Sequence, residues 1–253
     1  MKTLKLTKQE NYAVVQLNRG TSNSLNIEMF QELTQIFRDL DKDNDVKGVV
    51  LAGKGNFFSA GLDVIELYNY DEVKIEQLFE ALFEAMKALL SFSKPLVAAV
   101  NGHAPAGGCI LAICADYRIM AAGKFRIGLN EVPVGIIMPP FIFETYAYLL
   151  GKGKAAQFVL EGKLCTNEEA LESGLVNEVL DQEKVLEASI EKVKSFTKFS
   201  ANTWSKSKMN MRKELIANFQ SFDAQTKQDL LEQWWSNETR GILGALVDRL
   251  TKK

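Results

Sequence analysis

The feature that most constrains this chain is a glycine-bearing turn at residues 101–110, with the sequence NGHAPAGGCI. The apolar run directly before it, residues 95–100, has the composition of a strand buried on both faces of a sheet. The residues after it are nearly all apolar and favour a short buried helix over 108–115. The chain must therefore turn sharply from a sheet into a helix. Small residues let the backbone of such a turn come close to other groups.

The rest of the first half alternates between strand-like and helix-like segments. Residues 27–40 and 71–92 carry apolar side chains at helical spacing. The β-branched run at 46–52 predicts another buried strand. Further extended segments are expected at residues 12–17, 117–121 and 125–128. This alternation predicts an α/β fold in which helices cover both faces of a sheet.

Beyond about residue 140 the pattern becomes mostly helical. A helix begins near Thr166 or Asn167, since either can cap it and acidic residues follow in the first turn. Residues 174–180 predict a last strand, and helices follow from about residue 181, the final one including 243–250. The adjacent Trp234 and Trp235 point to different sides of a helix. We expect one in the core and the other at a subunit interface.

Composition narrows the class of protein. A length of 253 residues with 47% hydrophobic and 25% charged residues is typical of a globular enzyme-sized domain. The net charge of −2 gives no indication of nucleic-acid or membrane partners. No signal peptide or membrane span is expected, which favours a cytoplasmic protein. With one histidine and three cysteines, we expect no metal site and reduced, structural cysteines at Cys109, Cys114 and Cys165.

Two turns could hold an anion. Residues 105–108 open a helix, and residues 58–63, FSAGLD, form a second small-residue turn after a strand. The first N–H groups of a helix lack intrahelical partners and lie at the positive end of its dipole. Each turn alone could be no more than a tight bend. Together with the carboxylate of Glu131, they supply two backbone donors and one acid–base group, which are sufficient to form and quench an enolate.

These segments resemble the crotonase superfamily, also called the enoyl-CoA hydratase/isomerase family. The resemblance runs from about residue 14 to 180 and includes 17–19, 58–63, 105–109, 116–118 and 170–176. It implies a crotonase-like spiral of ββα units over residues 1–195 and a C-terminal helical trimerisation region over 196–253. It also implies a homotrimer or a dimer of trimers, and an acyl-CoA thioester as substrate.

The resemblance also implies a set of site residues. The backbone N–H groups of Leu62 and Gly107 would hold the thioester oxygen. The substrate-binding residues would be Ala60, Leu62, Asp63, Val64, Ile65, Gly107 and Ile110. Within the turn, the Asp63 side chain is expected to fix the backbone rather than to touch substrate.

The carboxylate count distinguishes between reactions of this family. Its hydratases carry two glutamates, and here the first position is Ile110 while the second is Glu131. One carboxylate suits a 1,3-proton shift, in which the same group removes a proton and returns it elsewhere. The chain therefore looks closest to the Δ3,Δ2-enoyl-CoA isomerases, which act in fatty-acid oxidation without a metal or redox cofactor. Apolar surroundings that include Ile136, Ile137 and Phe141 should raise the pKa of Glu131.

Other functions remain open at this point. The chain could be another acyl-CoA-processing crotonase, namely a hydratase, decarboxylase or thioesterase, or a non-catalytic acyl-CoA-binding subunit. His103 has no nucleophile motif beside it and is not expected to be catalytic. Glu144 and the basic run 206–213 are expected to be solvated, although one of these lysines or Arg249 could meet a CoA phosphate. Tyr68 and Tyr70 lie where the family has a mobile segment, and their role stays open.

Overall fold

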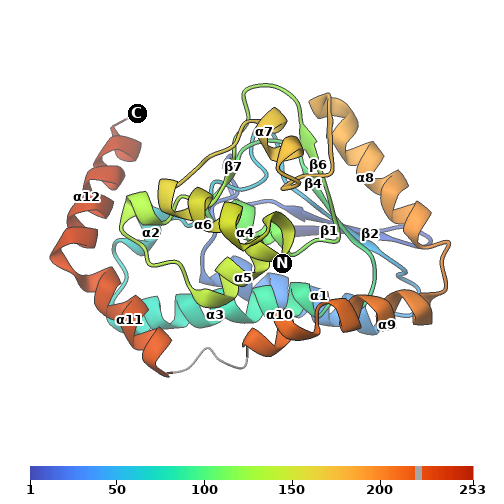
Figure 1. The fold of residues 1–253 in the computed structure, drawn as a ribbon, viewed down its shortest axis with the longest axis horizontal. Coiled ribbons are helices and arrows are strands. Elements are labelled where there is room, and N and C mark those ends of the chain that lie inside the picture. The colour runs from blue at the N-terminus through green and yellow to red at the C-terminus, as the bar shows by residue number, and fades with distance from the viewer. Residues whose placement is uncertain (220–223, 253) are drawn as a thin grey trace.

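The computed structural model describes residues 1–219 and 224–252, and its centre is a six-stranded sheet (Figure 1). The strands lie in the order β1-β2-β3-β4-β6-β8. The first pair is antiparallel and every later pair is parallel. The strand bounds are β1 Leu4–Lys8, β2 Ala13–Leu17, β3 Val49–Ala52, β4 Leu96–Val100, β6 Tyr117–Ala121 and β8 Glu178–Leu180.

Helices cover both faces of this sheet, as the alternating sequence predicts. The helices α1 (Ile27–Lys42) and α3 (Glu72–Leu90) pack against each other, and their buried side chains belong to the larger core. On the opposite face α8 (Gln182–Phe196) contacts β3, β4 and β6 through a smaller apolar cluster that includes Val185 and Val193. The all-apolar strand β4 is fully buried because it lies between these two layers.

A second, two-stranded sheet positions the glycine turn. The strands β5 (Ala104–Pro105) and β7 (Ile127–Gly128) are parallel, and their register pairs Pro105 with Gly128. Helix α4 (Gly107–Ile113) begins directly after β5, and the short 3-10 helix η1 (Val132–Val134) follows β7. The carboxyl ends of the two strands therefore lie side by side, each leading into a helical turn.

The chain beyond residue 140 is mostly helical, as expected. The helices α9 to α12 run along the lower edge of Figure 1 and up its left side, where α12 ends. The helices not yet given are α2 Val64–Leu67, α5 Pro140–Leu150, α6 Lys152–Glu161, α7 Asn167–Glu172, α9 Ala201–Met211, α10 Lys213–Asn218, α11 Ala224–Trp235 and α12 Asn237–Thr251. None of the helices in the described ranges is both long and apolar enough to cross a membrane.

Several element bounds differ from the sequence-based expectation. The strand expected at 174–180 covers only Glu178–Leu180, because Gly174 adopts a φ of +78° and turns the chain at the end of α7. The expected strand 125–128 is reduced to Ile127–Gly128, and 46–52 to Val49–Ala52. Strand β1 was not predicted, although Leu4 and Leu6 alternate with polar residues in the way an edge strand does.

Candidate active site

The two small-residue turns lie against each other. A Cβ added at Gly108 would lie 2.4 Å from the carbonyl oxygen of Ser59, so only glycine fits there. Gly61 adopts a φ of +84°, and a Cβ on it would lie 3.2 Å from the backbone nitrogen of Gly107. The close approach that the sequence led us to expect is therefore present between residues 59–61 and 107–108.

Two backbone donors emerge from this contact. Leu62 follows Gly61 in the first turn, and Gly107 is the first residue of α4. Among the described residues, neither N–H group has a hydrogen-bond acceptor. The residue before α4, Ala106, has a φ of +48°, a conformation that costs a non-glycine residue about 1–3 kcal/mol. This strain is held by the hydrogen bond from the Ala106 N–H to the Gly128 carbonyl, at 2.8 Å.

The carboxyl of Glu131 lies at the same edge of the small sheet. Glu131 comes three residues after Gly128 in β7, and Gly107 comes two residues after the paired Pro105 in β5. The Glu131 residue is only 6% exposed, and its Oε2 has no hydrogen-bond partner within the part of the chain that is described. Burial raises the pKa of this carboxyl from 4.5 to about 7, in the direction expected from its apolar neighbours.

A cavity of about 130 Å³ joins these groups. Six of the eight site residues expected from the sequence line it: Ala60, Leu62, Val64, Gly107, Ile110 and Glu131. Ile136 and Ile137 line it as well. Phe141 does not, because its ring packs against Phe83 and Phe219 in the core. Ile110 stands at the position where we expect a two-carboxylate hydratase to carry its first glutamate. It is 3% exposed and leaves the cavity apolar there.

Asp63 and Ile65 lie outside the cavity lining. The Asp63 side chain caps α2 through the Glu66 N–H at 3.1 Å and pairs with Arg19 at 2.6 Å, so it fixes the turn. Arg19 also pairs with Glu66, which accepts a hydrogen bond from the Tyr70 hydroxyl. Ile65 is 40% exposed. Both residues thus belong to the segment that carries Leu62 without facing the cavity.

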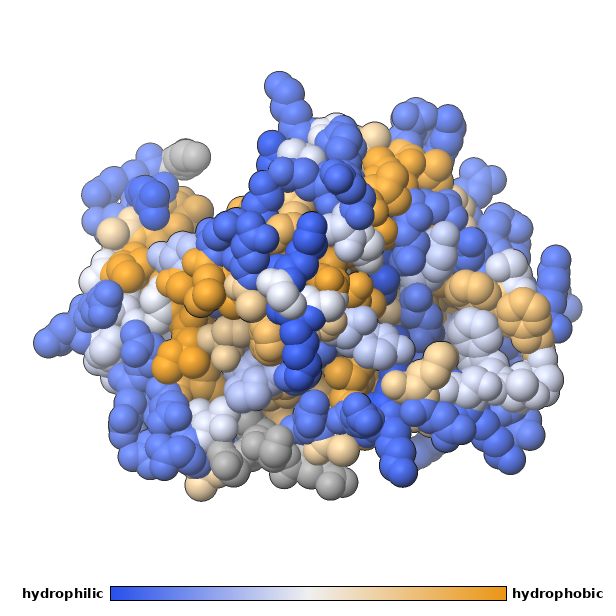
Figure 2. Space-filling view, viewed as in Figure 1, coloured by the Kyte–Doolittle hydropathy of each residue, from blue (hydrophilic) through white to orange (hydrophobic). Residues whose placement is uncertain are grey.

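The C-terminal helices complete the cavity, which the sequence did not indicate. Leu230 of α11 and Leu243 and Leu246 of α12 form part of its wall. Helix α12 is tied to the loop after α2, because Arg240 donates to the Tyr68 carbonyl at 2.9 Å and its guanidinium lies 3.8 Å from the centre of the Tyr68 ring. Figure 2 shows apolar residues gathered between α12, at the left, and the core.

The remaining candidates lie elsewhere. The His103 ring packs against Phe57 and Phe125 and does not line the cavity. Glu144 pairs with Lys152 at 3.2 Å. All three cysteines are free and buried. Trp234 is 2% exposed and in the core, whereas Trp235 is half-buried beneath Arg240, and its interface role stays a prediction.

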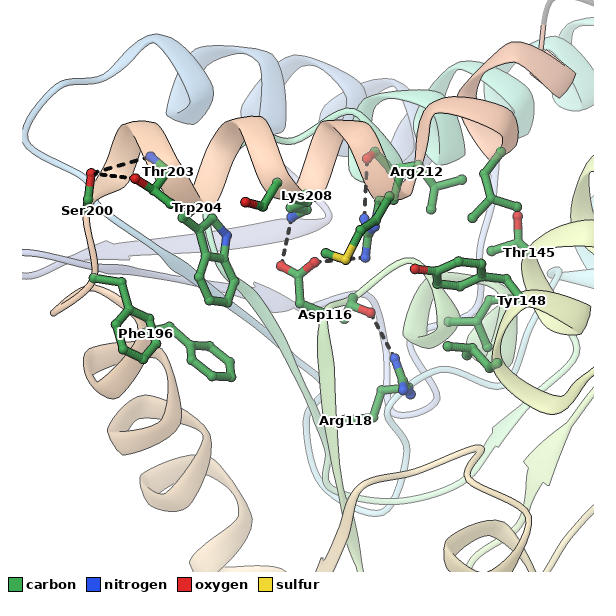
Figure 3. Close-up of a pocket in the computed structure, with 18 residues that line it drawn as sticks. Asp116, Arg118, Thr145, Tyr148, Phe196, Ser200, Thr203, Trp204, Lys208 and Arg212 are labelled. Atoms are coloured by element: carbon green, nitrogen blue, oxygen red, sulfur yellow. Dashed lines mark hydrogen bonds and ion pairs between the residues drawn. The ribbon is translucent and has the colours of Figure 1, made fainter.

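The basic run 206–213 is not wholly solvated, and that expectation was wrong for two residues. Lys208 and Arg212 are buried and both pair with Asp116, at 2.7 and 2.9 Å (Figure 3). The spacing of four residues places Lys208 of α9, and Arg212 directly after its last residue, on the same side as Trp204, a signal that the sequence did contain. Across the described residues, no three His, Cys, Asp or Glu side chains gather as metal ligands would.

Comparison with known proteins identifies relatives of this chain. Enoyl-CoA delta isomerase 1, mitochondrial, of Mus musculus is 37% identical over 175 residues, which cover 68% of this chain and 61% of the mouse protein. The 2,3-dehydroadipyl-CoA hydratase of Escherichia coli is 28% identical over 229 residues, covering 90% of this chain and 89% of that protein. The crystal structure of human mitochondrial delta3-delta2-enoyl-CoA isomerase gives a TM-score of 0.94 at 27% identity, over 99% of this chain and 98% of the human one.

The fold of the structure matches these crotonase-fold proteins along nearly its whole length. Residues 7–244 match the family described as Enoyl-CoA hydratase/isomerase. The chain therefore belongs to the enoyl-CoA hydratase/isomerase family, the crotonase superfamily.

Proposed function

We propose that this protein isomerises 3-enoyl-CoA thioesters to 2-enoyl-CoA thioesters in fatty-acid oxidation. The observation that carries the proposal is a single buried carboxyl, Glu131, in a cavity that also holds two backbone N–H donors and has Ile110 in place of a second acid. The likeness to proteins named enoyl-CoA delta isomerase supports the same choice.

In the proposed reaction, the N–H groups of Leu62 and Gly107 hold the thioester oxygen. The ionised Glu131 removes a proton from C2, the C2–H electron pair moves into the conjugated system, and a dienolate forms with negative charge on the thioester oxygen. Protonated Glu131 then delivers the same proton to C4, and the double bond moves from C3–C4 to C2–C3. One oxyanion donor of this kind is worth about 3–4 kcal/mol of barrier. The reaction needs no metal or redox cofactor.

The raised pKa of Glu131 suits both halves of this proton transfer. A pKa of about 7 makes the carboxylate a stronger base toward C2 than an exposed glutamate, while leaving it ionised in about half of the molecules at pH 7. The wall formed by Ile110 and Ile136 supplies no second carboxylate to activate a water molecule. This distinguishes the proposed isomerase from a two-carboxylate hydratase.

The test is turnover of 3-hexenoyl-CoA and of 2-hexenoyl-CoA, followed by absorbance of the conjugated thioester and by product analysis. We expect the first substrate to gain conjugation and the second not to be hydrated. Glu131→Gln should lower isomerase turnover by at least about 10³-fold, with acyl-CoA binding retained, while the matched Glu144→Gln should retain turnover. Rapid hydration of 2-hexenoyl-CoA by the wild type would contradict the proposal.

A second candidate is another crotonase reaction, since a hydratase is among the relatives. Ile110→Glu restores the second carboxylate of the hydratases and should bring detectable hydration only if the position faces the substrate as proposed. Malonyl-type thioesters test decarboxylation and thioester hydrolysis in the same assays.

Assembly and location also belong to the proposal. We propose a homotrimer or a dimer of trimers in which residues 196–253 form the contacts, and light scattering after size-exclusion chromatography tests this. A cytoplasmic location stays a prediction, since the name of the mouse relative includes the word mitochondrial.

A further inference from the structure

Leu25 lies between β2 and α1, directly before Asn26, the residue that caps α1. The Asn26 side chain accepts a hydrogen bond from the Met29 N–H at 3.1 Å and donates one to the Glu66 carboxylate at 3.2 Å. Leu25 itself is 0% exposed and does not line the candidate active site. Any effect of Leu25 on a reaction there must therefore act through its neighbours.

The backbone of Leu25 holds the first donor turn on both sides of Leu62. The Leu25 N–H donates to the Gly61 carbonyl at 2.8 Å, and the Leu25 carbonyl accepts from the Asp63 N–H at 2.9 Å. The Gly61 carbonyl and the Leu62 N–H belong to one trans peptide unit, which is planar, so they point in opposite directions. Because Leu25 binds that carbonyl, it also makes the Leu62 N–H point away from itself.

The side chain of Leu25 contacts the second donor turn. A Cβ added at Gly107 would lie 2.7 Å from the Cδ1 atom of Leu25, so this methyl group fills the space beside the glycine. The preceding residue, Ala106, has a φ of +48°, and such strain persists only while surrounding contacts hold the backbone. The Leu25 methyl group is one of these contacts, since it limits the space into which the turn could relax.

The segment that carries Leu25 also supports the rest of the first turn. The Ala60 N–H donates to the Ser22 carbonyl at 2.9 Å, and the Ser59 hydroxyl donates to the Asn23 carbonyl at 2.8 Å. The segment continues into α1, which packs against α3. Leu25 is thus held by the core while its backbone contacts one donor turn and its side chain contacts the other.

We propose that Leu25 is a positioning residue, which fixes the N–H groups of Leu62 and Gly107 relative to each other. The inference rests on the proposed function, in which both N–H groups hold one thioester oxygen. Two donors stabilise the same oxyanion only when both lie within hydrogen-bond distance of it. A displacement of about 1 Å can lower the rate by about 10²-fold.

The first test is steady-state turnover of 3-hexenoyl-CoA. Leu25→Val removes the Cδ atoms that face Gly107, whereas Leu25→Ile keeps one Cδ atom and the side-chain volume. We expect Leu25→Val to lower kcat by at least about tenfold with KM within about twofold, and Leu25→Ile to recover most of the loss. Leu33→Val is the matched control, because Leu33 of α1 is also 0% exposed and lies outside the cavity lining. It should retain kcat.

The second test does not use turnover. Hexanoyl-CoA has no double bond to move, and an isotope label at its thioester carbonyl allows difference infrared spectroscopy of the bound ligand. Hydrogen bonds to the carbonyl oxygen lower its stretching frequency. We expect this shift on binding to the wild type and to Leu33→Val, and the loss of most of it in Leu25→Val.

Equal carbonyl shifts in the wild type and Leu25→Val would overturn the positioning role, and so would an equal loss of kcat in Leu25→Val and Leu33→Val. A wild type that leaves the carbonyl frequency unchanged would remove the donor pair and this inference with it. If the wild type shifts the frequency but does not isomerise 3-hexenoyl-CoA, the proposed function fails, and the infrared comparison alone decides the role of Leu25.

Discussion

Glu131→Gln should stabilise the folded protein at alkaline pH while it removes activity. The Glu131 residue is 6% exposed, and burial raises its pKa from 4.5 to about 7. Because one pKa unit corresponds to about 1.4 kcal/mol, ionising Glu131 in the folded protein costs roughly 3 kcal/mol more than ionising it in the unfolded chain. A glutamine of nearly the same shape does not carry that cost.

The raised pKa of Glu131 determines the pH range over which the folded protein loses stability. Below about pH 4.5 the carboxyl is protonated in both states, so wild type and variant should depend on pH in the same way. Above that pH the unfolded chain releases its proton first, and the stability that protonated Glu131 gives the fold is lost as the pH rises through 7. Between pH 5 and pH 8 the wild type should lose roughly 2 kcal/mol of unfolding free energy that the variant retains.

Urea unfolding at pH 5 and pH 8, at one fixed protein concentration and followed by circular dichroism, measures this difference. Glu172→Gln is the matched control, because Glu172 is exposed on α7 and its loss should not change the pH dependence. If Glu131→Gln and the wild type change in parallel within about 0.5 kcal/mol, the carboxyl is not buried as described and the reasoning is refuted.

Turnover should depend on ionisation of the same Glu131 carboxyl. We expect kcat/KM to rise about tenfold per pH unit below pH 7 and to level off above it. A flat profile from pH 5 to 9 would contradict a buried general base. Gly108→Ala should reduce turnover by at least about 100-fold, because its Cβ would meet the Ser59 carbonyl at 2.4 Å and displace the donor loops; unaltered steady-state kinetics would count against this. Asp116→Asn should lower the unfolding free energy by about 3–5 kcal/mol, because Lys208 and Arg212 would lose their buried carboxylate; a urea midpoint equal to that of the wild type would exclude this role.

The sequence was sufficient to bring the two small-residue turns and Glu131 to one cavity, because local rules determine these segments. The glycines at 61 and 108 permit a close approach that few other residues allow, and Glu131 lies a fixed number of residues after a strand. The expected rise in the pKa of Glu131 also followed from neighbours within the same segments.

The C-terminal wall of the cavity and the burial of Lys208 and Arg212 could not be predicted, because both depend on contacts between distant parts of the chain. Leu230, Leu243 and Leu246 look like any apolar face of a helix, and only the packing of α11 and α12 brings them to the cavity. Lys208 and Arg212 lie in a run of charges that usually faces water, and Asp116, about ninety residues earlier, is what permits their burial. The spacing of Lys208 and Arg212 indicates a shared face, but no local pattern names Asp116 as their partner or the cavity as the place where Leu230, Leu243 and Leu246 pack.

The walls of the cavity come from segments that are far apart in the sequence, so the ribosome makes them at different times. The donor turns and the acid are all present once residue 131 has emerged from the ribosome, but the wall from α11 and α12 arrives about a hundred residues later. Without the docking of α12 through Arg240 onto Tyr68, this side of the cavity would be open to water. Enclosure of the cavity thus depends on how tightly α12 is held, whereas the two turns and Glu131 are positioned by the core alone.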